Sequence, residues 1–98
     1  QEWTLNEELF FLGRHLFNNR HLMLAKKIFE YLIKNCESSK KEPDIHAYYA
    51  YITFKSSNKD EALQHIEHAI NNRSDILFGL FGIPYSSNMT AREFFNRI

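Results

Sequence analysis

The spacing of the apolar residues most constrains this chain: they recur every three to four positions over most of its 98 residues. This spacing gathers apolar side chains on one face of a helix, whereas a half-buried strand needs strict alternation. Only three glycines and two prolines are present to interrupt the pattern. With 44% hydrophobic residues, the chain can also form a packed core. We therefore predict a single all-α domain over residues 1–98.

Capping residues and turns predict four helices between residues 4 and 72. Thr4 and Glu7 have the spacing of a capping box, and Asn58 and Glu61 also fit a helix N-terminus. Pro43 suits the first turn of a helix. We expect helices at about 4–18, 21–35, 43–55 and 59–72, separated by turns and a polar loop at 37–42. Their apolar faces would comprise Leu5, Leu9, Leu12 and Leu16; Leu22, Ala25, Phe29, Leu32 and Ile33; Ile45, Tyr49, Ala50 and Ile52; and Ala62, Leu63, Ile66, Ala69 and Ile70.

The last quarter of the chain has a different character. Residues 75–83 are strongly apolar and contain two glycines, which predicts a short helix. A loop should follow over residues 84–89. Thr90 and Glu93 then have capping-box spacing, and we expect a final helix that carries Phe94, Phe95 and Ile98.

The first helix pair matches the second at a shift of 37 residues. At this shift the small residues of the first pair align with small residues of the second, and its large apolar residues align with large residues. Small side chains let antiparallel helices approach closely, and the large ones fill the seam between successive pairs. Such self-similarity indicates a helical repeat. The aligned pairs are Gly13 with Ala50, Ala25 with Ala62, Phe29 with Ile66, and Leu12 with Tyr49.

At these positions the chain resembles the tetratricopeptide repeat (TPR) family. The first repeat carries Leu9, Leu12, Gly13, Leu16, Ala25, Phe29 and Leu32 at the family's motif positions, and the second carries His46, Tyr49, Ala50, Thr53, Ala62, Ile66 and Ala69. The proline that closes the family motif is absent from both. The resemblance implies two antiparallel helix hairpins in a right-handed α-α superhelix, with repeats at about 6–39 and 43–76 and one or two capping helices in 77–98. A generic four-helix array is the alternative.

The resemblance also implies a concave groove lined by the first helix of each pair. The groove residues transferred by position are Phe10, Arg14, Phe17, Asn18, Ala47, Tyr51, Phe54 and Lys55. Four aromatic side chains away from the predicted core suggest that something covers them. We expect a protein or peptide partner there, which would make the chain an adaptor or regulatory module. The alternatives are that the chain's own tail fills the groove, or that a second copy does, giving a homodimer.

Some members of this family hold a C-terminal carboxylate with a lysine, asparagine and arginine clamp. Arg14, Asn18 and Lys55 could contribute to one, but Glu7 and Asp44 occupy neighbouring groove positions. Acidic side chains there would repel a carboxylate. We therefore do not expect this clamp.

Charge and cysteine content restrict the class of partner and the cellular setting. Twelve basic and twelve acidic residues give a formal net charge of zero, which argues against nucleic acid and against a polybasic membrane patch. No apolar run approaches the ~20 residues of a membrane-spanning helix. The single cysteine, Cys36, favours a reducing and hence cytoplasmic setting. Because residue 1 is glutamine, we expect an excerpt of a longer chain or a processed one.

No motif for catalysis, a cofactor or a metal is present. His65 and His68 lie three residues apart, with Glu61 one turn before His65, but a zinc site needs three or four convergent ligands. We expect the histidines to face solvent. Cys36 has no marked base beside it to activate a nucleophile. The sequence thus predicts no enzyme activity, no cofactor and no metal.

Overall fold

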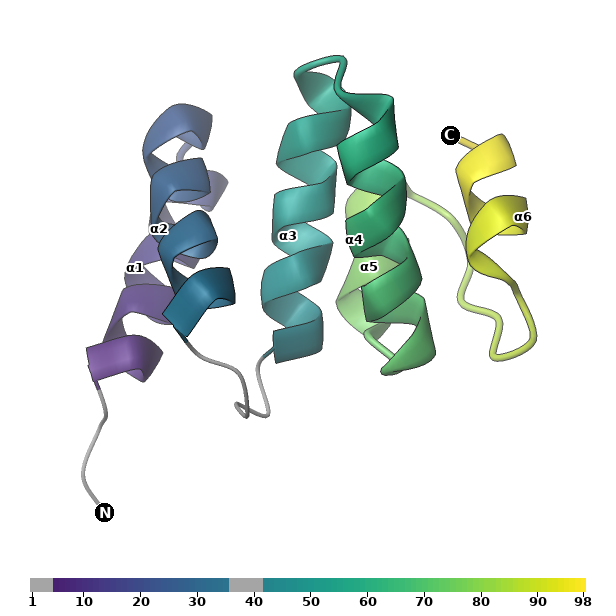
Figure 1. The fold of residues 1–98 in the computed structure, drawn as a ribbon, viewed down its shortest axis with the longest axis horizontal. Coiled ribbons are helices and arrows are strands. Elements are labelled where there is room, and N and C mark those ends of the chain that lie inside the picture. The colour runs from purple at the N-terminus through teal and green to yellow at the C-terminus, as the bar shows by residue number, and fades with distance from the viewer. Residues whose placement is uncertain (1–4, 36–41) are drawn as a thin grey trace.

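A computed structural model describes residues 5–35 and 42–98, and the regular secondary structure of this part of the chain is all helix, without strands. Figure 1 shows the helices standing side by side, with α1 and α2 at one end and α6 at the other. The helices are α1 (Leu5–Asn18), α2 (Leu22–Asn35), α3 (Glu42–Lys55), α4 (Lys59–Asn71), α5 (Asp75–Phe81) and α6 (Ala91–Asn96). All six predicted helices are present, and the described boundaries agree with the expected ones to within one or two residues.

The capping predictions hold wherever the structure describes them. The Asn58 side chain accepts from the Glu61 backbone N–H at 3.3 Å, and its amide donates to Glu61 at 3.0 Å. Thr90 and Glu93 form a complete capping box at the start of α6. The expected Thr4 cap and most of the 37–42 loop lie outside the described residues, and Glu42 already belongs to α3.

Four helices end in the same backbone arrangement, which closes the turn that follows. After α1, the backbone N–H of His21 donates to the Leu16 carbonyl at 2.8 Å, and the same bond over five residues follows α3, α4 and α5. Each closure places one residue in the left-handed region: Arg20, Ser57, Arg73 and Gly82. This is the Schellman motif, in which the reversed backbone satisfies the last carbonyls of the helix. After α1, α3 and α4 the chain therefore reverses within three residues, whereas nine residues separate α5 from α6.

Helix α3 lies at the centre of the packing. Every residue from 45 to 50 is buried, since α2, α4 and α5 all pack against this helix. One apolar cluster surrounds Phe29 and includes Phe10, Tyr48 and Ile52, and a second includes Ala50, Ile66, Phe78 and Phe94. The clusters lie on opposite sides of α3, so this helix joins the two halves of the core.

The four small residues singled out by the 37-residue shift, Gly13, Ala25, Ala50 and Ala62, are all buried. At Gly13 a methyl group would lie only 2.9 Å from the ring of Phe29. Ala50 shares its cluster with the smaller Ile66. The first helix pair therefore combines the smaller Gly13 with the larger Phe29, whereas the second combines the larger Ala50 with the smaller Ile66.

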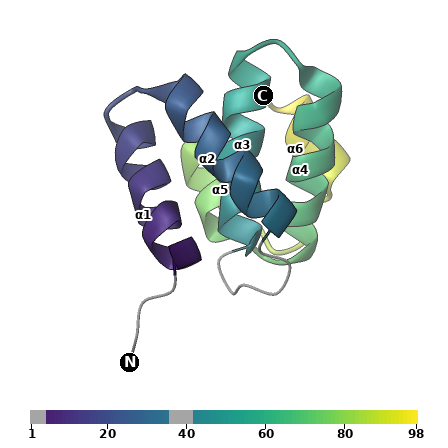
Figure 2. The same ribbon diagram turned by 60° about the vertical axis from the view of Figure 1, so that its left-hand side comes forward.

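The end of the chain does not repeat the packing of the first two pairs. Helix α3 packs on α2, but α5 packs mainly on α3 and α6 packs on α4. Figure 2 shows α5 between α1 and α3, behind α2. Ile76 and Leu80 of α5 reach the cluster around Phe29. The tail thus covers part of the surface on which the groove was predicted.

Candidate functional site: a recess between α1 and α3

Two predicted groove residues lie in the core, so the prediction that they line an open groove is wrong for them. Phe10 is 2% exposed and its ring contacts those of Phe29 and Tyr48. Ala47 is fully buried in the cluster that includes Phe78. Phe10 is buried because it lies on the side of α1 that meets Phe29 of α2 and Tyr48 of α3, whereas the predicted leucine face leaves Leu5 and Leu12 exposed.

The predicted groove residue Phe54 is covered by the tail. Its ring meets the edge of Phe81 at a centroid separation of 5.7 Å and that of Phe95 at 6.3 Å. The Nζ atom of Lys59 lies 5.9 Å from the same ring. Phe81 also contacts Tyr51, at 5.3 Å. Coverage of the groove by the chain's own tail was one of the alternatives, and it applies to the end of the predicted groove around Phe54.

The other predicted residues separate into two groups. Phe17, Asn18, Tyr51 and Lys55 line one recess of about 470 Å³, with Arg20 and Leu22. Arg14 lies elsewhere: its guanidinium carbon is 5.9 Å from the centre of the Phe10 ring and 5.2 Å from that of Phe11. The recess therefore keeps half of the predicted set.

The walls of the recess come from the ends of three helices. Phe17 meets the edge of Tyr51 at 5.4 Å, which joins the end of α1 to α3. Leu22 begins α2, and Lys55 ends α3 with its Nζ atom 5.4 Å from the centre of the Tyr51 ring. Arg20 is held in the left-handed conformation that ends α1. The backbone hydrogen bonds that end α1 thus fix the rim of the recess, and the rings of Phe17 and Tyr51 form its apolar floor.

The recess is positively charged. Arg20 and Lys55 contribute two exposed cations, and none of the lining residues is acidic. The acidic residues that argued against binding a carboxylate are not among those that line it, and Asp44 accepts a hydrogen bond from Ser74 at 2.9 Å. Such a site can hold a carboxylate beside an apolar side chain. Sequence reasoning missed Arg20 and Leu22, because the transfer by position stopped at Asn18 and did not include the turn.

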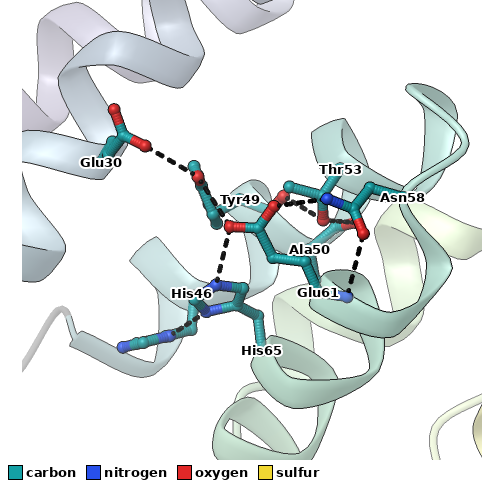
Figure 3. Close-up of polar contacts among 8 residues, drawn as sticks. All are labelled: Glu30, His46, Tyr49, Ala50, Thr53, Asn58, Glu61 and His65. Atoms are coloured by element: carbon teal, nitrogen blue, oxygen red, sulfur yellow. Dashed lines mark hydrogen bonds and ion pairs between the residues drawn. The ribbon is translucent and has the colours of Figure 1, made fainter.

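A second polar group lies between α2, α3 and α4, and Figure 3 shows its contacts. His46 and His65 face each other with their Nδ1 atoms 2.8 Å apart, so one ring donates and the other accepts. The His68 ring lies 3.9 Å from that of His46, centre to centre. His46 is only 8% exposed, and His65 and His68 are half-buried. The expectation that the histidines face solvent is therefore wrong for these three, because His65 and His68 of α4 pack against His46 and Tyr49 of α3.

Burial favours the neutral form of the His46 and His65 imidazoles. It lowers the pKa of His46 to about 3, with nearby His68 and His65 adding to the effect. Burial also lowers the pKa of His65, although Glu61 opposes that shift. Among residues 5–35 and 42–98, no group of three or more histidine, cysteine or acidic side chains is arranged to hold a metal ion.

Tyr49 links α2 to α4 in the same network. Its hydroxyl lies 3.2 Å from Glu30 Oε2 and 3.1 Å from Glu61 Oε2, as Figure 3 shows. One phenol proton therefore serves two carboxylates from different helices. Burial, followed by the Glu61 and Glu30 carboxylates, raises the pKa of Tyr49. The neutral hydroxyl remains a donor at every ordinary pH and helps to fix α2 against the second pair.

Comparisons with protein-family models, with curated proteins and with solved structures gave no match to this chain. Within the described part of the chain, no helix combines the length and the apolar character that crossing a bilayer requires. The recess and its charge are thus the observations on which a function can be argued.

Proposed function

We propose that the chain is a protein-interaction module that binds an acidic peptide segment in the recess between α1 and α3. The observation that carries the proposal is the pairing of two half-buried rings, Phe17 and Tyr51, with two exposed cations, Arg20 and Lys55. The rings would take an apolar side chain of the partner, and the cations would take a neighbouring carboxylate. The partner would be a polypeptide, with no catalytic step, cofactor or nucleic acid involved.

The proposal includes a TPR-like arrangement of two hairpins in an adaptor or regulatory module of the cytoplasm. Burial of Gly13, Ala25, Ala50 and Ala62 supports close approach within each pair. The altered packing of α5 limits the groove, since the tail covers the Phe54 end. The binding surface is therefore short and suits a few residues of a peptide better than a long helix.

Selection from a random 12-residue peptide display library would test this function. We expect the enriched peptides to carry aspartate or glutamate, or a free C-terminus, beside leucine or phenylalanine. Enrichment of basic peptides would contradict the charge argument. The selected peptide, labelled with a fluorophore, would then be titrated by anisotropy at low and high salt, and its affinity should fall as salt screens the cations.

Two variants with a matched control assign the binding to the recess. Arg20→Gly removes one cation and keeps the left-handed turn, because glycine adopts this conformation freely. Lys55→Ala removes the other. We expect each to weaken binding by about three- to tenfold, equivalent to about 0.7–1.4 kcal/mol. Arg73→Gly makes the same backbone and charge change outside the recess, and binding should remain unaltered. Equal effects of Arg20→Gly and Arg73→Gly would refute the site.

A further inference from the structure

The first helix pair carries an apolar surface on the side that faces away from α3. Five of the six large hydrophobic side chains that are exposed in the described residues belong to α1 and α2. Leu5 is 66% exposed, Leu12 48%, Leu24 53% and Tyr31 47%. We call this surface the end face, and it consists of Leu5, Leu9, Leu12 and Leu16 of α1 with Leu24, Ile28 and Tyr31 of α2.

Helical spacing and packing make the end face continuous. The α1 leucines follow at three- and four-residue intervals, and so do Leu24, Ile28 and Tyr31. Ile28 lies against α1, since its Cγ2 atom is 3.1 Å from the position that a Cβ atom would take at Gly13. The half-buried Leu9, Leu16 and Ile28 therefore fill the space between the exposed side chains of the two helices.

The second helix pair shows what covers the corresponding surface. The 37-residue shift places Leu12 on Tyr49 and Leu24 on Glu61. In the second pair Tyr49 is 3% exposed, and its hydroxyl contacts Glu30 of α2. A neighbouring helix thus covers this side of a pair. The end face differs in being apolar, so its cover requires no matched hydrogen bonds.

We propose that the end face binds the end face of a second copy of this chain, forming a dimer with two-fold symmetry. A standard interface takes about 800 Å² from each partner, and roughly three-fifths of that area is apolar. The required apolar area is about 500 Å². The four exposed side chains of the end face supply most of it at roughly 100 Å² each, and the half-buried Leu9, Leu16 and Ile28 add the remainder. The end face therefore has the size and composition of one half of a dimer interface.

Charges at its two edges favour a copy of the same face over an unrelated surface. Glu8 lies along the α1 edge, three residues after Leu5 and four before Leu12. Lys27 and Lys34 lie along the α2 edge, each three residues after an end-face side chain, and all three charges are exposed. A two-fold axis parallel to the helices places the α1 edge of one copy over the α2 edge of the other. Acidic edge then meets basic edge twice.

Sedimentation velocity over a wide concentration range tests the dimer. We expect the purified protein to pass from monomer to dimer over micromolar concentrations. Leu12→Glu combined with Leu24→Glu should weaken association at least 100-fold, with circular dichroism showing unchanged helix content. Tyr85→Glu is the matched control, because Tyr85 is 52% exposed and lies outside the end face. A protein that stays monomeric at several hundred micromolar overturns the proposal, and so does a dimer that Tyr85→Glu disrupts and the leucine variants do not.

A charge exchange tests the orientation of the two copies. Glu8→Lys and Lys34→Glu should each weaken the dimer several-fold at low salt, and the two changes together should restore it. Failure of the double variant to recover would overturn the two-fold arrangement. Arg20→Gly in the recess should leave dimerisation unchanged. A failure of the dimer proposal can therefore be distinguished from a failure of the proposed peptide site.

Discussion

Gly13→Ala tests the close approach of α1 and α2 most directly. The added methyl group would lie 2.9 Å from Phe29 Cε1, 3.1 Å from Phe29 Cζ and 3.1 Å from Ile28 Cγ2. Phe29 is fully buried, and its ring stacks on that of Tyr48 with centroids 5.3 Å apart and planes 11° apart. The ring can yield only by disturbing this stack, so the substitution forces a shift in the core.

Two opposing effects set the size of the change in stability. Alanine is more favourable than glycine inside a helix by about 0.5–1 kcal/mol. Overpacking a well-filled core costs typically about 1–3 kcal/mol. We expect the packing cost to exceed the helical gain, with a net loss of about 0.5–2 kcal/mol in the free energy of unfolding. At about 4–8 °C per kcal/mol for a domain of this size, the melting temperature should fall measurably.

Gly79→Ala provides the matched control. Gly79 lies in α5, is exposed, and has no atom within 4 Å of the added methyl position. Only the helical gain applies there, so Gly79→Ala should raise the free energy of unfolding by up to about 1 kcal/mol. Urea denaturation followed by circular dichroism measures both variants under one set of conditions. The same mutation is therefore predicted to have opposite signs at two helical glycines.

A double-mutant cycle tests the cause of the loss. The second helix pair uses Ala50 with Ile66 where the first uses Gly13 with Phe29. In a Phe29→Ile background, Gly13→Ala should no longer be destabilising, with a coupling energy of about 1 kcal/mol or more. If Gly13→Ala stabilises the protein as much as Gly79→Ala does, or if the cycle shows no coupling, the inferred close contact of α1 with Phe29 is wrong.

Three further predictions follow from the polar network and the turns. In the unfolded chain His46 is protonated below about pH 6.5, whereas in the folded chain it is protonated only near pH 3. Its contribution to the free energy of unfolding is therefore complete above pH 6.5 and decreases as the pH falls from 6.5 towards 3. His46 alone should remove about 2 kcal/mol between pH 7 and pH 5, measured by urea unfolding at constant ionic strength; equal stability at both values would disprove its buried neutral state. Ser57→Gly should stabilise the protein by about 0.5–1 kcal/mol, because Ser57 has a φ of 67°, whereas Ser57→Ala should not. Tyr49→Phe should cost about 1 kcal/mol in thermal or urea unfolding by removing the donor shared by Glu30 and Glu61, and a double variant with Glu30→Gln should lose less than the sum of the two single losses.

The candidate site could be predicted only in part from the sequence. The resemblance to a repeat predicts Phe17, Asn18, Tyr51 and Lys55 as binding residues, and these four line the recess. Arg20 was missed because its position depends on its own left-handed backbone conformation, which the presence of an arginine does not predict. The histidine network was missed for a related reason: exposure of a histidine depends on which helix covers it, and helical spacing does not contain that information.

The sequence by itself determined the helices, their caps and the small residues at which they meet, because these depend on side-chain spacing and on hydrogen bonds between residues a few positions apart. Only the tertiary structure decided which side of each helix is covered. On α1, Phe10 is 2% exposed and Leu12 is 48% exposed, although both are large and apolar. An apolar arc wider than one contact can pack in more than one direction. The positions of α2, α3 and α5 decide between these directions, and they leave Leu12 on the surface.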